Sequence, residues 1–322
     1  MSPVVTYNRR HTLHRLWNSL NRTLESDFEW VIVDNGSTDN TASQISTWKG
    51  SAPFDIVYHR LSTNGGKSKG LNIGKTLISG KYVIVIDDDD ALFDNALTQI
   101  KFYITATKFD SRLEVGNLVF RAVTEDGLLH GELCPMGVVF ETTSLQMKYV
   151  HTNWRIGERC SVTKASVFKE FDYIELPPPN NDLLEVVNLR KARKFKSIYI
   201  DSCPIRIYWI NDGLDRMTTR PRHYVSTSIG NYFDNFYRLN EQFDYFFCAP
   251  RYFIRSARNM CRAGLHNRKF YRQQYCELSS GDVKLFWLVF GILPGSLKFF
   301  LDVLRLRLKL ISVSQSVQYR GY

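Results

Sequence analysis

Residues 82–90 read Tyr-Val-Ile-Val-Ile-Asp-Asp-Asp-Asp, an apolar run followed at once by four carboxylates. The run Tyr82 to Ile86 predicts a buried β-strand. Crowded carboxylates raise one another's pKa unless a cation or hydrogen-bond donors keep them ionised. A strand that ends in Asp87 to Asp90 therefore indicates either a site for a hard divalent metal, which prefers oxygen ligands, or a solvated acidic turn.

Predicted strands and helices alternate before this acidic segment. Leu13, Leu16 and Leu20 recur at helical spacing, and an apolar run ends at Asp34. Such alternation predicts a parallel sheet with helices on both faces, and ligands of these sheets bind beyond the carboxyl ends of the strands, where Asp34 and Asp87 lie. The predicted elements are strand 3–6, helix 13–20, strand 29–33, helix 41–48 capped by Ser37 or Thr38, strand 55–59, loop 63–70, helix 71–79 and strand 82–86.

The pattern after Asp90 is less regular. It predicts strands over residues 117–123, 137–142 and 196–200, an extended run over 203–210, and a helix over 182–194. With 322 residues, the chain is long enough for one large domain plus an appendage, or for two domains.

The net charge of +10 is unevenly distributed. Residues 216–322 hold 17 Lys and Arg against 6 Asp and Glu, so the last third is basic and the rest is balanced. Such a basic region attracts anionic lipid, acidic glycan or nucleic acid, but no nucleic-acid-binding motif accompanies it, so we expect no nucleic-acid partner. Six cysteines without a C-x-x-C pair, and no secretion signal at the N-terminus, predict a cytoplasmic protein.

Four motifs in order closely resemble the family 2 glycosyltransferases. They are Thr6-Tyr7-Asn8-Arg9, the segment 28–41 with Asp34-Asn35-Gly36-Ser37, Asn64-Gly65-Gly66-Lys67 with Asn72, and Ile86 to Asp90. The resemblance implies a GT-A α/β fold, with a mostly parallel sheet between helices, over residues 1–218, and leaves residues 219–322 as a basic helical region. It implies inverting, metal-dependent transfer of a sugar from a nucleotide-diphosphate sugar to a glycan or lipid-linked glycan, in the assembly of surface polysaccharide.

The same resemblance implies roles for individual residues. Asp89 and Asp87 are expected to hold Mg²⁺ or Mn²⁺, with Asp89 as the direct ligand and Asp87 nearer the ribose. Asp87 and Asp88 are also expected at the nucleotide sugar, with Asp88 as the spacer between the pair, and Asp90 is expected to be an ordinary loop charge. Lys67 would add a positive charge near the phosphates; a solvated loop lysine is the alternative. The residues expected to surround the nucleotide are Thr6, Tyr7 and Asn8 at the base, Asp34 at the base or ribose, and Asn64, Gly66 and Lys67 in the glycine-rich loop.

The resemblance also requires a carboxylate that deprotonates the acceptor hydroxyl. Asp182 and Glu185 are both candidates, because a spacing of three places them on one face of the predicted helix. Asp182 could instead cap that helix, and Glu185 could be a favourable first-turn charge. Glu158 and Arg159 match a short element on the acceptor side, with a surface ion pair as the alternative.

The tail alternates apolar residues and cations. The uncharged stretch Leu285 to Leu297 is interrupted by Pro294 and Gly295, and it is shorter than the roughly 20 helical residues that span a bilayer. Arg251, Arg255, Arg258 and Arg262 recur on another predicted helix. We therefore expect peripheral attachment to the anionic inner face of the cell membrane; a packed helical subdomain or a homo-oligomer interface is the alternative.

Other functions explain the sequence less well. Haloacid-dehalogenase-type phosphotransferases also carry Asp-x-Asp after an apolar strand, but there the motif normally begins the chain and continues into Thr or Val, where this chain has Ala91. A non-catalytic anion- or membrane-binding module is a further alternative, against which the intact Asp34, Asp87 and Asp89 argue.

Overall fold

The computed structural model describes residues 3–134, 137–151, 157–176, 183–209 and 228–318, with side chains as far as residue 305. The chain divides into two compact units, one formed by residues 1–178 and 182–220 and the other by residues 179–181 and 221–322. The expected boundary between residues 218 and 219 lies outside the described residues, so it stays a prediction.

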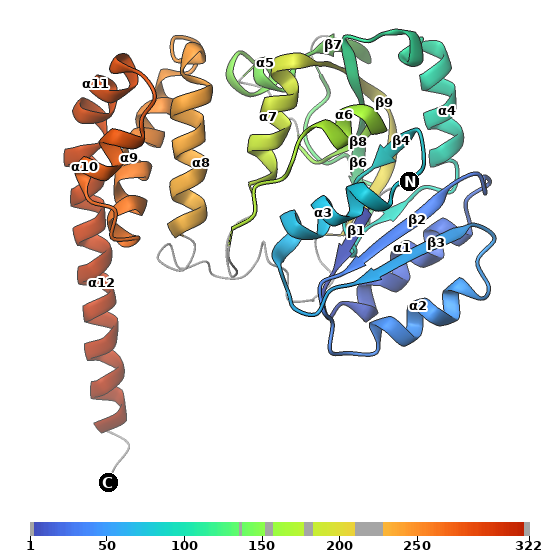
Figure 1. Cartoon of the computed structure of the whole chain (residues 1–322), viewed down its shortest axis with the longest axis horizontal. Helices are drawn as coiled ribbons and strands as arrows, with labels where there is room; N and C mark the ends of the chain where they lie inside the picture. The colour runs from blue at the N-terminus through green and yellow to red at the C-terminus, as the bar shows by residue number, and fades with distance from the viewer. Residues whose placement is uncertain (1–2, 135–136, 152–156, 177–182, 210–227, 319–322) are drawn as a thin grey trace. The chain divides into compact units, whose positions relative to one another are not determined.

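The first unit begins with a parallel three-stranded sheet in the order β1-β2-β3 (Figure 1). Helices follow each strand, as the alternation predicts. Residues at helical spacing on α1, among them Leu13, Leu16 and Leu20, are buried. The elements are β1 (Pro3–Thr6), α1 (Arg10–Asn21), β2 (Glu29–Asp34), α2 (Thr41–Lys49), β3 (Asp55–Arg60) and α3 (Gly66–Leu77).

Aromatic side chains hold α1 and α2 against one face of this sheet. Trp17 of α1 stacks on Trp48 of α2 with ring centroids 5.0 Å apart, and on Trp30 of β2 at 6.3 Å. All three are buried. Large stacked rings remove much apolar surface from water, so this cluster holds the last turns of both helices against the beginning of β2.

Helix α3 lies close to β1 because it presents glycines there. A Cβ on Gly70 would come within 2.6 Å of Val5, and one on Gly74 within 2.3 Å of Pro3. The helix begins at Gly66, five residues before the predicted start at Leu71. Lys67 therefore lies in the first turn of a helix and not in a loop.

The second sheet has the order β4-β8-β6-β9-β5, and β7 pairs with β9. The pair β6 and β9 is parallel, and the other pairs are antiparallel. The extended runs predicted over 196–200 and 203–210 form one strand, β9. The elements are β4 (Tyr82–Ile84), β5 (Ala91–Leu92), α4 (Ala96–Ala106), β6 (Val115–Thr124), β7 (Val139–Thr142), α5 (Ser144–Tyr149), β8 (Arg159–Lys164), α6 (Ala165–Glu170), α7 (Leu184–Lys194) and β9 (Lys196–Tyr208).

This strand order decides where the aspartates lie. Strands β4 and β5 are at the two ends of the order, so residues 85–90 cross the end of the sheet between them. Leu92 of β5 pairs with Arg206 of β9. The crossing segment is therefore held beside β9, more than a hundred residues away in sequence.

The second unit is helical. Phe253 of α9 and Trp287 of α11 are completely buried in it, and the predicted helix that carries Arg251 to Arg262 is α9. Among the described residues no single helix has both the length and the apolar composition to cross a bilayer, whereas α11 and the first part of α12, bent by 48°, meet those criteria as a pair. The helices are α8 (Ser228–Glu241), α9 (Pro250–His266), α10 (Tyr271–Glu277), α11 (Gly281–Phe290) and α12 (Ile292–Gln318).

The stability of the first unit should depend on pH through a buried lysine. Lys191 of α7 is 5% exposed, and its Nζ lies over the rings of Phe168 and Tyr173, 5.2 and 5.4 Å from their centroids. Burial, together with the charge of Lys75, lowers the pKa of Lys191 to about 8. Because the unfolded chain holds this proton up to about pH 10.4, the folded state is disfavoured by Lys191 at pH 7 and recovers stability as pH rises through this window.

We expect Lys191→Met to raise the unfolding midpoint at pH 7, by about 2–4 °C for each kcal/mol gained. The advantage over wild type should shrink between pH 8 and 10.5. Lys194→Met on the same helix, whose side chain is 61% exposed, is the matched control and should show no such trend. Thermal unfolding monitored by circular dichroism measures both; an advantage of equal size at pH 7 and pH 10.5 contradicts the prediction.

Candidate active site

The four aspartates differ in exposure along the crossing segment. The side chains of Asp87 and Asp89 are 35% and 15% exposed, whereas those of Asp88 and Asp90 are 6% and 0% exposed. The interpretation of Asp90 as an ordinary loop charge is therefore wrong, whereas the spacer role of Asp88 stays a prediction. Both carboxylates are buried, and burial of a charge requires a partner.

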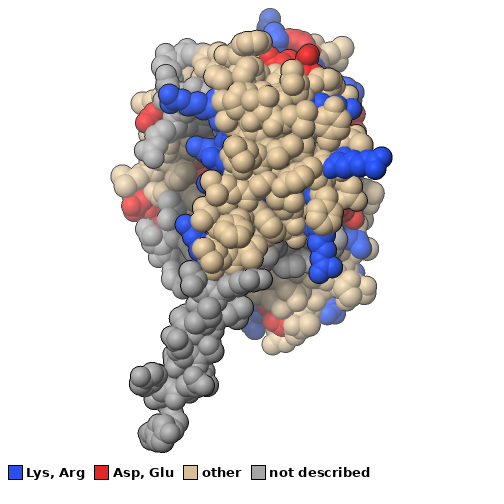
Figure 2. Space-filling model, turned by 90° about the vertical axis from the view of Figure 1, so that its left-hand side faces the viewer, with Lys and Arg blue, Asp and Glu red and all other residues tan. Residues whose placement is uncertain are grey.

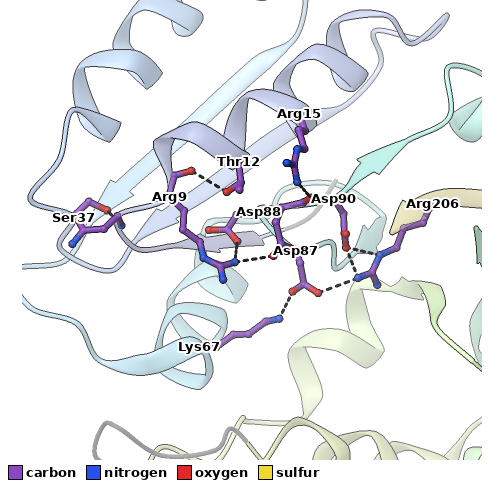
Figure 3. Close-up of polar contacts among 11 residues, drawn as sticks. Arg9, Thr12, Arg15, Ser37, Lys67, Asp87, Asp88, Asp90 and Arg206 are labelled. Carbon is purple, nitrogen blue, oxygen red and sulfur yellow. Dashed lines mark hydrogen bonds and ion pairs between the residues drawn. The ribbon is translucent and has the colours of Figure 1, made fainter. Parts of the chain in front are cut away.

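Three cations from three different elements provide those partners (Figure 3). Arg206 of β9 donates from Nε to Asp90 Oδ2 at 2.7 Å and from Nη2 to Asp87 Oδ2 at 3.0 Å. Arg9, which precedes α1, donates from Nη1 to Asp88 Oδ1 at 2.9 Å and to Asp89 Oδ2 at 3.0 Å. Lys67 of α3 donates to Asp87 Oδ1.

Burial and these cations act in opposite directions on the carboxyl pKa values. Burial raises the pKa of Asp88 to about 6 and that of Asp90 to about 7, against the opposing charges of Arg9 and Arg206. Burial also disfavours ionised Asp87, but Lys67 and Arg206 outweigh it and hold its pKa well below the usual range. Asp87 is thus a carboxylate at any pH near neutrality.

Asp87, Asp89 and Asp90 have the chemistry of a hard-metal site. One carboxylate oxygen from each lies within 4.8 Å of the others. Asp90 Oδ1 is buried and has no hydrogen-bond partner among the described residues. An unpartnered buried carboxylate oxygen beside two partly exposed carboxylates fits a Mg²⁺ or Mn²⁺ ion, which takes oxygen ligands. The predicted pair, Asp87 and Asp89, is joined here by Asp90.

The loops after β1 and β2 are bonded to each other. Asn8 adopts a left-handed backbone conformation (φ 54°), and its Oδ1 accepts the Thr38 backbone N–H at 2.7 Å. Ser37 Oγ accepts the Asn8 N–H at 2.9 Å, so Ser37 does not cap α2. Asp39 Oδ1 instead accepts the Thr41 N–H at 3.1 Å. The capping prediction for Ser37 or Thr38 is therefore wrong.

Asp34 is buried between these loops. Its Oδ1 accepts the Ser37 N–H at 2.7 Å, and its Oδ2 accepts the Tyr58 hydroxyl at 2.8 Å. Burial and the Asp34 carboxylate raise the pKa of Tyr58 well above its usual value, so Tyr58 remains a donor. Thr6 is also buried, whereas Tyr7 is 41% exposed. The nucleotide-binding roles of these residues stay predictions.

The glycine-rich segment shapes the start of α3. Asn64 Oδ1 accepts the Gly66 N–H at 2.9 Å, and Gly66 has a φ of 84°, which a side chain would disfavour. The Gly66 carbonyl accepts Asn35 Nδ2 at 3.0 Å. This arrangement delivers Lys67 to Asp87.

Of the two candidate bases, only Glu185 lies within the described residues. Asp182 lies outside the described residues. Glu185 is in the first turn of α7, where its half-exposed carboxylate pairs with Lys148 of α5. A first-turn glutamate is stabilised by the helix dipole whatever its chemical role, so the assignment of Glu185 as the base stays a prediction.

Arg159 is not part of a surface ion pair. Its side chain is 8% exposed and pairs with Asp201, which also accepts from the buried Arg121 at 3.1 Å. The Glu158 backbone N–H donates to His130 Nδ1 at 2.7 Å. The surface alternative is thus wrong for Arg159, and a contact of Glu158 or Arg159 with acceptor or diphosphate stays a prediction.

Residues 4–116 match the family model described as "Glycosyl transferase family 2". Over these residues the chain is similar to the family 2 glycosyltransferases. Abequosyltransferase RfbV of Salmonella typhimurium is 35% identical over 103 residues, which make up 31% of this chain and 31% of that protein. The similarity thus spans less than a third of the length of this curated relative.

Solved glycosyltransferases resemble the chain over a longer stretch. Staphylococcus aureus TarS residues 1–349, in complex with UDP-GlcNAc, has a TM-score of 0.57 at 16% identity and covers 90% of this chain and 79% of its own. The mannosyltransferase PcManGT of Pyrobaculum calidifontis, in complex with GDP-Man and Mn²⁺, has a TM-score of 0.51 at 13% identity and covers 94% and 86%. At these identities the likeness concerns the fold, and it confirms the predicted GT-A α/β class.

The sequence analysis did not predict the most buried cation of the acidic site. Arg206 is 5% exposed and forms a fork between Asp87 and Asp90. Arg9 lies in the motif Thr6-Tyr7-Asn8-Arg9, but the motif does not indicate which residues Arg9 binds. The sequence shows only that Arg206 is a lone cation in the predicted extended run over 203–210. Arg is rarely buried unless paired, but this position does not indicate which residues are its partners.

The pair of Arg206 with Asp90 should be strongly coupled. Arg206→Met leaves a buried carboxylate unpaired, so we expect a loss of about 3–5 kcal/mol in the free energy of unfolding. Adding Asp90→Asn should recover part of that loss. Arg22→Met removes a pair with Asp94 whose side chains are 58% and 55% exposed, and should cost no more than about 1 kcal/mol. Urea unfolding measures all three; equal losses for Arg206→Met and Arg22→Met contradict the coupling.

Proposed function

We propose that the protein transfers a sugar from a nucleotide-diphosphate sugar to a hydroxyl group of a glycan or lipid-linked glycan, with inversion at the anomeric carbon and with help from a divalent metal. The observation that supports this most directly is the acidic cluster at the end of the sheet, inside the domain that matches family 2. Three partly or fully buried carboxylates converge there beside Lys67 and Arg9.

Asp87, Asp89 and Asp90 would hold the Mg²⁺ or Mn²⁺ ion. When bound, such an ion neutralises the negative charge that develops on the departing diphosphate. The crystallised mannosyltransferase that shares the fold contains Mn²⁺ with GDP-Man, which supports this part of the proposal. Lys67 and Arg9 border the same carboxylates and would face the phosphates as fixed positive charges.

The loops after β1 and β2 would hold the nucleoside. Their hydrogen bonds through Asn8 and Asp34 make them rigid before a ligand binds, and pre-formed loops lose less entropy on binding. Tyr7, which is 41% exposed, is the aromatic side chain available to a base. RfbV, whose name describes an abequosyl transfer, and TarS, crystallised with UDP-GlcNAc, are consistent with a nucleotide sugar donor.

Inversion requires a base on the side of the anomeric carbon opposite the diphosphate. The acceptor oxygen forms the new bond to carbon as the bond to the diphosphate oxygen breaks, and the hydroxyl proton passes to a carboxylate. Glu185 and Asp182 are the two candidates. The match to a glycosyltransferase family favours this reaction over the phosphotransferase alternative.

The metal assignment is tested with Asp89→Ala. We expect metal-stimulated turnover of a nucleotide sugar to fall by about 10²–10³-fold, the loss typical of removing one stabilising group of the transition state. Asp94→Ala, an exposed aspartate next to the site in sequence, is the control and should retain activity. Release of nucleoside diphosphate is measured over a panel of nucleotide sugars with Mn²⁺. If Asp89→Ala turns over the donor at the wild-type rate, Asp89 is not a metal ligand. If the wild type turns over none of the donors, the transferase proposal is overturned.

The base is tested by comparing Glu185→Gln with Asp182→Asn. We expect Glu185→Gln to reduce transfer by about 10²–10⁴-fold while donor affinity stays constant, because only the proton acceptor is lost. Glu170→Gln, on the exposed surface, controls for charge removal. Transfer rates with saturating donor and dissociation constants by calorimetry separate the two effects. If Asp182→Asn alone loses transfer, Asp182 is the base.

A further inference from the structure

The second unit exposes a continuous set of large apolar side chains on α11 and α12. Leu285 is 64% exposed and Leu293 is 79% exposed. Figure 2 shows a broad surface without charge on this side of the molecule, bordered mainly by Lys and Arg. We define the apolar face as Leu285, Leu288, Val289 and Phe290 of α11 with Leu293, Leu297, Phe300, Leu301 and Leu304 of α12.

Helix α11 is apolar on both sides. Val283, Phe286 and Trp287 are buried toward the rest of the unit, and Phe286 packs against Phe243 and Phe246 with ring centroids 5.0 and 5.1 Å away. Leu285 and Val289 point the other way and are exposed. A helix that is apolar all round is characteristic of a protein core or of a membrane, and not of a helix with one side in water.

Helix α12 turns its polar side inward. Asp302 accepts two hydrogen bonds from Arg262 of α9, both at 2.6 Å, and lies 3.0 Å from His266. Gly295 lies so close to α9 that a Cβ there would come within 2.6 Å of Cys261. Leucines and phenylalanines remain on the outside, the reverse of a water-soluble amphipathic helix.

Cations lie at the border of the apolar face. Lys284 lies over the ring of Tyr275, 5.3 Å from its centroid, and Arg305 is exposed beside Leu304. The pKa of Lys298 is lowered first by the charge of Arg258 and further by burial, Arg262 and Arg305, which shows how closely these cations gather. Residues 250–305 hold ten Lys and Arg against three Asp and Glu.

The apolar face and the cations at its border together indicate which partner covers the face. Two copies joined through the apolar face by a twofold axis would bring the same cations together, and like charges repel. A leaflet with anionic lipids satisfies both parts of the surface, because its acyl chains accept the apolar side chains and its phosphates accept Lys and Arg. Lys and Arg at such borders bury their aliphatic stems and direct their charge to the headgroups.

We infer that the apolar face inserts into one leaflet of an anionic phospholipid bilayer, with Lys284, Lys298 and Arg305 at the level of the lipid phosphates. The inference does not depend on transferase activity. A protein with this attachment works on substrates at the membrane surface, which favours a lipid-linked acceptor among those proposed above.

The test is flotation of the full chain with vesicles of phosphatidylcholine alone or with about 30% phosphatidylglycerol. We expect the wild type to float with the anionic vesicles and to bind neutral ones more weakly. Leu285→Glu and Leu293→Glu should each reduce binding by about tenfold or more, since each removes a leucine from the acyl region. Leu113→Glu changes an equally exposed leucine of the first unit, 83% exposed, and should bind as the wild type does.

The cations are tested separately. Lys298→Gln and Arg305→Gln should each weaken binding to anionic vesicles by about fivefold, the effect of roughly 1 kcal/mol per charge, and leave binding to neutral vesicles unchanged. Wild-type protein that stays unbound on both vesicles overturns the inference without any variant. A dimer in light scattering that Leu293→Glu converts to a monomer, with no vesicle binding, assigns the face to a second copy instead. No donor or acceptor is present, so either outcome leaves the transferase proposal to its own tests.

Discussion

Four adjacent carboxylates at the end of a sheet must be neutralised, and the arrangement of the first unit follows from that requirement. Arg206 provides one cation from β9, Arg9 a second from the start of α1, and Lys67 a third from the start of α3. Arg9 and Arg206 stabilise the crossing of the segment 85–90 from β4 to β5, because their partners Asp88 and Asp90 are buried. The ion pairs therefore join the parallel sheet, through Arg9, to the second sheet, through Arg206.

The three cations are not equivalent. The side chain of Arg206 is 6% exposed and pairs with Asp90, whose carboxylate is completely buried. If Arg206 moved away, Asp90 would be left as a buried charge without a partner. The side chains of Lys67 and Arg9 are 31% and 26% exposed. Their partners Asp87 and Asp89 are partly exposed too, whereas Asp88, which Arg9 also binds, is only 6% exposed. Exposed ion pairs are weak and exchange readily for other partners. We therefore regard Arg206 as the fixed part of the site, Lys67 as the cation that can turn most readily to a phosphate, and Arg9 as intermediate, because it also binds the buried Asp88.

Local patterns were sufficient for much of the fold and for part of this site. Helical spacing located α1, and apolar runs located β2 and β4, because burial on one face or both leaves a periodic trace in the sequence. The alternation continues past β4, since Asp87 and Asp89 are the more exposed pair and Asp88 and Asp90 the buried one. The predicted start of α3 is too late, because Gly66 and Gly70 fall in the predicted loop over 63–70, although Gly70 is helical and allows close contact with β1. Arg206 could not be predicted: its partners lie 116 and 119 residues away, and no local pattern records a distant ion pair.

The two units differ in how buried charges and exposed apolar side chains are compensated. In the first, buried like charges are compensated within the chain, by cations from three elements. In the second, α11 has apolar side chains on both sides, and only one side is covered by the described residues of its own unit. Helical periodicity could predict the helices but not this difference, because a helix that is apolar all round has no distinct inner face. Monomeric soluble proteins rarely leave such a patch uncovered, and Asp302, the acidic residue of α12, is already paired with Arg262. The described residues of its own unit leave this apolar surface uncovered, and the cations at its border favour an anionic surrounding, as the bilayer proposed above would provide.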